Sequence, residues 1–129
     1  MPPYIYHVIS PVTDPKAQTA IFTVLALVLL DLVVGIVGAV VTHTFSSEKM
    51  RSGLLHKFME LCAMALGAIL DGALVGGFDL ATQPLLIATC VYIGIMETGS
   101  VLELIKKYDP DAEGLVGWIT SFVSPKGGE

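Results

Sequence analysis

The sequence predicts an all-α membrane protein with three transmembrane helices and a short amphipathic interfacial helix near the C-terminus. Of its 129 residues, 53% are hydrophobic and only 15% are charged, which is too little polar surface for a soluble domain of this size. The mean hydropathy is +0.74. The apolar residues gather in three runs, each close to the roughly 20 residues that a hydrocarbon core of about 30 Å requires.

The first transmembrane helix is expected at residues 20–42. Its Leu, Ile, Val and Phe residues each favour insertion by roughly 0.3–0.6 kcal/mol, which together outweighs the cost of Asp31. The preceding segment, residues 1–19, carries four prolines and is expected to be extended or interfacial rather than regular. It holds a single Lys, so the run lacks the basic lead-in of a cleavable signal peptide and should be retained.

The second and third helices are expected at residues 58–78 and 85–106, which completes a transmembrane domain over residues 20–106. The second helix has fewer strongly apolar residues than the first. It also carries Glu60 and Asp71, each of which costs roughly 2.5–3.5 kcal/mol if placed centrally. This helix is therefore marginal alone and is expected to need partners.

Basic residues indicate the orientation. They cluster in the polar turn at residues 44–57 and again at Lys106 and Lys107, while the turn at residues 79–84 has none. By the positive-inside rule the first loop and the C-terminus are cytoplasmic, and the N-terminus and second loop are external.

The remaining residues, 107–129, are expected to form a cytoplasmic segment. After Pro110, apolar residues recur at helical spacing and acidic residues occupy the first turn. Trp118 belongs to this apolar face and is expected at the membrane interface. The tail at residues 124–129 is polar.

Each span carries one carboxylate near its middle: Asp31, Asp71 and Glu97. We expect no Lys or Arg at that depth to neutralise them, so they should face one another, another subunit or water, or else be protonated. They could line or gate an aqueous opening, or they could form an interhelical clamp with donors such as Thr98 and Ser100. Both interpretations remain open at this point.

Small residues recur at steps of four, a spacing that allows helices to approach closely. They are Gly35 and Ala39 in the first span and Ala68, Gly72 and Gly76 in the second. The same spacing serves packing within one chain or self-association. Because the second helix is marginal in lipid, it should gain from association.

Several classes of function are disfavoured. No Ser-His-Asp grouping, Gly-rich phosphate loop or zinc motif can be built from these residues, so an enzyme, a metal site and a cofactor are not expected. No basic stripe is long enough to follow a phosphate backbone, so nucleic acid is not an expected partner. The lipid bilayer is the expected partner.

Residues 30–104 resemble the phage lysis and toxin-secretion holin family. The resemblance lies in the run Asp31-Leu32-Val33-Val34-Gly35, in the loop residues Ser46, Ser47, Gly53 and Lys57, in Asp71, and in the run Met96-Glu97-Thr98-Gly99-Ser100-Val101-Leu102-Glu103. Met96 stands where the family often has asparagine, and the N-terminal segment is long and proline-bearing.

The resemblance implies a protein that accumulates in the cytoplasmic membrane, forms a homo-oligomer and opens lesions through which an endolysin or a toxin leaves. Asp31, Asp71 and Glu97 would then line or gate the opening. One alternative is a structural or anchoring subunit of a membrane complex, in which the carboxylates only bond neighbouring helices. A weaker alternative is a cation or proton channel, since intramembrane carboxylates often mark ion paths.

Overall fold

The computed structural model describes residues 2–78 and 85–123, and every element in them is helical. In chain order the elements are α1 (Pro3–Ile9), η1 (Ser10–Thr13), α2 (Pro15–Val41), α3 (Ser47–Asp71), η2 (Gly72–Gly77), α4 (Leu85–Tyr108), η3 (Pro110–Ala112) and α5 (Glu113–Val123). Elements η1 and η3 are 3-10 turns, and η2 is a stretch of π-helix. The connection expected at residues 79–84 and the tail expected at residues 124–129 lie outside the described residues.

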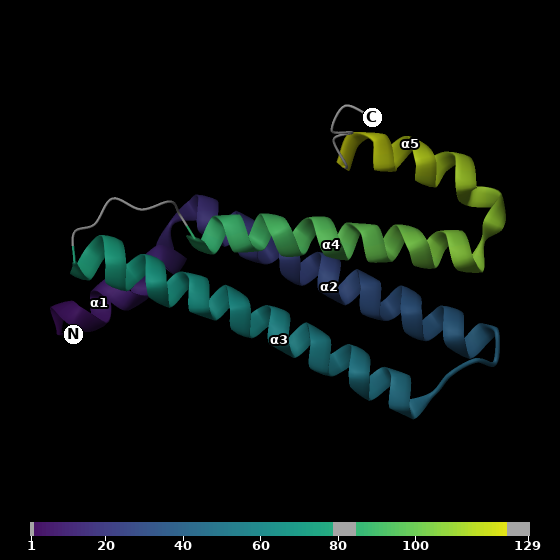
Figure 1. Ribbon diagram of the computed structural model, residues 1–129, viewed down its shortest axis with the longest axis horizontal. Coiled ribbons are helices and arrows are strands. Elements are labelled where there is room, and N and C mark those ends of the chain that lie inside the picture. The colour runs from purple at the N-terminus through teal and green to yellow at the C-terminus, as the bar shows by residue number, and fades with distance from the viewer. Residues whose placement is uncertain (1, 79–84, 124–129) are drawn as a thin grey trace.

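Three helical stretches are long and apolar enough to cross a membrane: Pro15–Val41, Ser47–Gly77 and Leu85–Tyr108. In Figure 1 they run side by side as an elongated bundle, with α4 packed against both α2 and α3. Large apolar side chains such as those of Phe22 and Phe58 are exposed on the outside, as expected of a surface that meets lipid. The predicted fold class, with three spans and a short C-terminal helix, is confirmed.

The expectation of an extended N-terminal segment is wrong. Residues Pro3–Ile9 form α1, and α2 begins at Pro15 rather than near Ala20. Prolines do not prevent this, because Pro3 and Pro15 each occupy the start of a helix, where the missing N–H has no intrahelical partner to lose. Asp14 caps α2, since its side chain accepts a hydrogen bond from the Ala17 N–H at 3.2 Å.

Helix α3 also begins earlier than expected, at Ser47 rather than near Phe58. The Ser46 side chain accepts a hydrogen bond from the Lys49 N–H at 3.4 Å, and Glu48 lies in the first turn. A hydroxyl cap followed by an acidic first turn stabilises a helix N-terminus. Most of the predicted polar loop is therefore the first three turns of α3.

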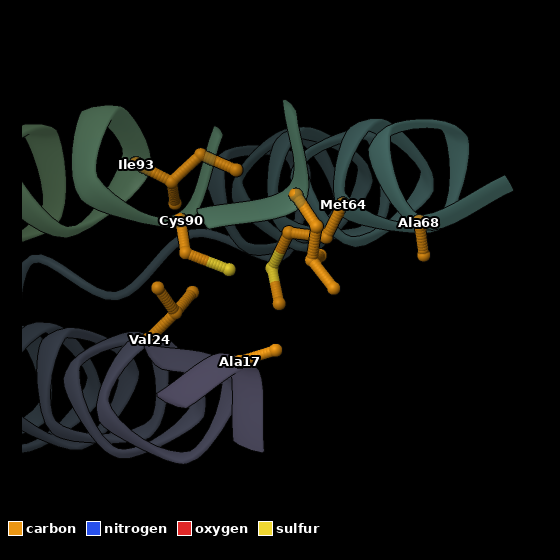
Figure 2. Packing of buried hydrophobic residues seen from close by; sticks show 7 residues of the cluster. Ala17, Val24, Met64, Ala68, Cys90 and Ile93 are labelled. Carbon is orange, nitrogen blue, oxygen red and sulfur yellow. The ribbon is translucent and has the colours of Figure 1, made fainter. Parts of the chain in front are cut away.

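An apolar core fills the half of the bundle nearest α1. It consists of side chains from all three spans: Ala17 and Val24 of α2, Met64 and Ala68 of α3, and Leu86, Cys90 and Ile93 of α4. Figure 2 shows Val24 and Cys90 pointing toward one another across α2 and α4. This core fixes the relative positions of the three helices on one side of their polar groups.

The other half of the bundle is open. Helices α2 and α3 hardly touch, although both pack on α4. In Figure 1, α3 diverges from α4 toward the end where residues 42–46 connect α2 to α3.

Helix α5 folds back along α4 (Figure 1), with Val116 buried. The exposed rings of Trp118 and Phe122 stack edge to face with centroids 5.0 Å apart. The location of α5 at the membrane surface stays a prediction.

Candidate functional site

Three charged side chains, one from each span, meet inside the bundle. The Lys57 ammonium on α3 donates hydrogen bonds to Asp31 Oδ2 on α2 at 2.6 Å and to Glu97 Oε2 on α4 at 2.8 Å. All three residues are at least 90% buried. We call Asp31, Lys57 and Glu97 the ion triad. It joins α2 to α3 at a level where these two helices have few other contacts.

The three members of the ion triad lie at one level of the bundle. Roughly ten residues, or about 15 Å of helix, separate Asp31 from Val41, Lys57 from Ser47, and Glu97 from Tyr108. The three helix ends lie at the same end of the bundle (Figure 1). If these helix ends lie at the membrane surface, the triad is about halfway through a hydrocarbon core about 30 Å thick.

The expectation that no cation reaches the depth of the carboxylates is wrong. It depended on starting the second span at Phe58, which left Lys57 in the loop. With α3 beginning at Ser47, Lys57 is well inside the helix and its side chain points inward. A signal for this was present: Lys57, Glu60 and Asp71 fall at helical spacing with Met64, Gly67 and Ala68, and together these six residues form the buried stripe of α3.

Glu60 lies one turn after Lys57 and is also buried. Its Oε1 is 2.9 Å from His56 Nε2. The contact is a close approach rather than an aligned hydrogen bond, because neither carboxylate oxygen of Glu60 has a hydrogen-bond partner within the described residues. A buried carboxylate in this condition is costly if ionised. Glu60 thus extends the polar stripe of α3 beyond the triad.

The structure separates Asp71 from the other two predicted carboxylates. Asp71 Oδ1 accepts a hydrogen bond from the Leu85 N–H at 2.7 Å, and Oδ2 accepts one from the Leu86 N–H at 2.8 Å. A carboxylate at a helix N-terminus satisfies otherwise unpaired N–H groups and interacts favourably with the helix dipole. Asp71 therefore caps α4 from the end of α3.

The small residues that recur at steps of four have different surroundings in the structure. A side chain at Gly72 would meet the backbone of His7 and Val8, and one at Gly76 would meet the His7 side chain. Because both positions lack a side chain, α1 can pack closely against η2. Ala68 belongs to the apolar core, and a Cβ added at Gly35 would lie 3.7 Å from Leu104 Cδ1 of α4. Ala39 lines an open groove beside the ion triad. All of these are contacts or surfaces within one chain.

Of the four residues expected in the family-motif loop, three line the groove beside the ion triad. Ser46, Gly53 and Lys57 line the same groove as Asp31 and Gly35. Ser47 is not among the lining residues and forms the first residue of α3.

Among residues 2–78 and 85–123, no group of three or more His, Cys, Asp or Glu side chains is placed to hold a metal ion. Lys57 occupies the position between Asp31 and Glu97 that a cation would need. The arrangement can therefore hold helices together, and it can be broken to expose charge.

The chain matches no curated protein and no solved structure. The family model of the bacteriophage holin family matches residues 16–111, a stretch that contains the ion triad and nearly all of the three spans. Members of that family are membrane proteins that form pores and catalyse no reaction. The chain therefore belongs to the bacteriophage holin family.

Proposed function

We propose that this holin forms homo-oligomers in the bacterial cytoplasmic membrane and opens lesions that release an endolysin or a toxin. Family membership and the three spans support the pore-forming class. The observation that carries the mechanism is the ion triad, in which a buried lysine is paired with carboxylates from two other spans.

The triad stabilises a closed subunit. A charge exposed to lipid near the bilayer centre is expensive, and such groups are found paired or facing water. Here each charge of the triad is paired within one chain, and the outer surface of the spans is apolar. Subunits in this state can accumulate in the membrane without opening a path for ions.

Opening exposes the same groups to water. The inward stripe of α3 is the most polar face of any span, because it contains Lys57, Glu60 and Asp71. If α3 separates from α2 and α4 at the level of Lys57 within an oligomer, Lys57 and Glu60 line a hydrated opening together with the partners Asp31 and Glu97. In this mechanism the triad is the gate, and hydration of its charged side chains converts the closed form to the open form.

The distribution of basic residues supports an orientation with the N-terminus outside and the C-terminus cytoplasmic. Lys49 and Arg51 lie in the first turns of α3, and Lys106 and Lys107 lie in the last turn of α4, at the same end of the bundle. The opposite end of α2 carries Lys16 alone. The more basic end is the cytoplasmic one.

The second candidate is a non-conducting structural subunit. The observation in its favour is that the triad and the Asp71 cap are both complete within one chain. Under this alternative the polar contacts only fix the packing, and the membrane stays sealed.

Induced expression in a bacterium distinguishes the two. Membrane potential is followed together with release of a co-expressed cytoplasmic murein hydrolase. A holin gives a delay, then sudden depolarisation with hydrolase release. Steady growth at full potential, with membrane insertion confirmed by fractionation, would contradict lesion formation and favour the structural subunit.

Variants of the triad test the gate. Lys57→Met leaves two buried carboxylates without their partner, which costs about 3–5 kcal/mol in a closed form, so depolarisation should come earlier. The triple variant Asp31→Asn, Lys57→Met, Glu97→Gln removes all three charges and should restore or lengthen the delay. Lys106→Met, which changes an exposed lysine, is the matched control. Unchanged timing in both triad variants would exclude the triad as the gate.

A further inference from the structure

An open groove runs between α3 and the α2–α4 pair, and the proposed function uses only the charged pair Asp31 and Lys57 at its inner end. Its volume is about 440 Å³, within the roughly 300–1,000 Å³ typical of ligand pockets. It is bounded by residues from all three spans and by the connection between α2 and α3.

The two ends of the groove differ in chemistry. Lys49 and Lys107 line it near the helix termini. Asp31 and Lys57 line its inner end and are paired with each other. Within the described residues neither Lys49 nor Lys107 forms an ion pair, and Lys107 Nζ lies 5.2 Å from the centroid of the Tyr108 ring. The mouth therefore carries an excess of positive charge.

The walls between these ends are mostly apolar, with Leu32, Ile36 and Leu104 among the lining residues. The mouth lies at the level of the first turn of α3 and the last turn of α4, which is the membrane interface, and the inner end lies about 15 Å deeper. A basic mouth at headgroup depth, followed by an apolar cleft into the hydrocarbon, matches a molecule with an anionic head and an apolar chain.

We infer that this groove binds one anionic phospholipid, with its phosphate between Lys49 and Lys107 and the start of an acyl chain along Leu32 and Ile36. Basic pockets between transmembrane helices are suited to anionic lipid headgroups. A free phosphate would use only the mouth of the groove, and a helix of a second copy would not need its positive charge. The lipid is the occupant that uses both the basic mouth and the apolar walls of the groove.

The test is retention of lipid by the full chain, purified in detergent with equal amounts of phosphatidylglycerol and phosphatidylcholine and measured by native mass spectrometry. The wild type should retain phosphatidylglycerol preferentially. In the double variant Lys49→Gln, Lys107→Gln, this preference should fall about fivefold for each lysine removed. Lys106→Gln is the matched control, because Lys106 lies at the same level but pairs with Glu113 at 3.5 Å. An unchanged preference in the double variant would overturn the assignment.

A second pair of variants tests the groove without changing charge. A Cβ added at Gly53, which lines the groove, meets no atom of the described residues within 4 Å, and the same holds for Gly99, which does not line it. Gly53→Phe should fill the groove and abolish lipid retention, while Gly99→Phe should not. Equal retention by both variants would contradict the proposal.

Two further outcomes identify a different occupant. Displacement of the lipid by millimolar inorganic phosphate would show that the mouth binds only a free anion. If Gly53→Phe instead abolishes self-association, measured by the mass of the complex, and leaves lipid retention intact, the groove holds a second copy. Either result would overturn the lipid assignment.

Discussion

Ser100 Oγ donates a hydrogen bond to Asp31 Oδ1 at 2.7 Å, on the carboxylate oxygen opposite the one that Lys57 contacts. Asp31 therefore has a partner on each oxygen, one from α4 and one from α3. This contact makes Ser100 the neutral member of the polar cluster around the ion triad, and it can be changed without altering any charge.

Ser100→Ala should destabilise the closed subunit by about 1.5–3 kcal/mol, because a hydrogen bond to a buried charged group is lost. The measurement is thermal unfolding in detergent. Thr98→Ala is the control on the same helix, since Thr98 Oγ1 bonds only the Gly94 carbonyl of its own helix, at 2.8 Å; its loss should cost less than about 1 kcal/mol. Equal effects of the two variants would mean that the Ser100 bond adds nothing specific.

Asp71→Ala should release the first turn of α4, because the Leu85 and Leu86 N–H groups lose their acceptors. The expected cost is about 1–2 kcal/mol, and Asp71→Asn, which keeps one acceptor oxygen, should recover part of it. Amide hydrogen exchange at Leu85 and Leu86 measures the effect directly. Protection that is unchanged in Asp71→Ala would show that the carboxylate does not cap α4.

Gly72→Leu should displace α1 from the bundle. A side chain there meets backbone atoms of His7 and Val8, and backbone cannot move aside as the end of a flexible side chain can. Limited proteolysis within residues 3–9 should become faster in this variant. Gly77→Leu is the control, since a Cβ added at Gly77 meets no atom of residues 2–78 and 85–123 within 4 Å. Cleavage at the same rate in both variants would argue against close packing of α1 on Gly72.

His43→Gly should stabilise the chain by about 1 kcal/mol. His43 has a φ of 58°, the left-handed region, where a side chain costs roughly 1–2 kcal/mol and glycine costs little. The turn itself is kept by backbone hydrogen bonds from the His43 N–H to the Val40 carbonyl and from the Thr44 N–H to the Ala39 carbonyl. These bonds form the Schellman pattern, in which glycine is common at this position.

The reverse substitution checks the same argument. His43→Val should lower the midpoint of thermal unfolding, because a β-branched residue is disfavoured at positive φ. A midpoint that rises in His43→Val, or falls in His43→Gly, would mean that the imidazole makes a stabilising contact that outweighs the backbone cost.

The three spans could be predicted from the sequence because length and hydropathy alone decide insertion in a bilayer. The carboxylates Asp31 and Glu97 could also be identified, since an ionisable residue within a long apolar run is conspicuous. Their pairing with Lys57 could not, because it depends on where α3 begins. The serine cap at Ser46 is a weak local signal in the sequence. Because it starts α3 at Ser47, Lys57 lies within the helix and not in the loop where it was expected.

Two other features depend on contacts between residues distant in the sequence. The cap formed by Asp71 on Leu85 requires α3 and α4 to meet at their ends, which no local pattern specifies. The spacing of Gly72 and Gly76 is the same whether the partner is another subunit or α1, so only the fold shows that α1 packs there. The self-association surface therefore stays a prediction.

Within the part of the chain that the structure describes, polar contacts attach helix α3 to its neighbours at two residues, Lys57 and Asp71, about 21 Å apart along its axis. The two are unequal. The Lys57 contact is a set of charges beside an open groove, while the Asp71 contact adjoins the apolar core. When the first breaks and the second holds, α3 does not leave the bundle but swings about its Asp71 end, so the subunit would open as a wedge that is widest at the Ser47 end of α3.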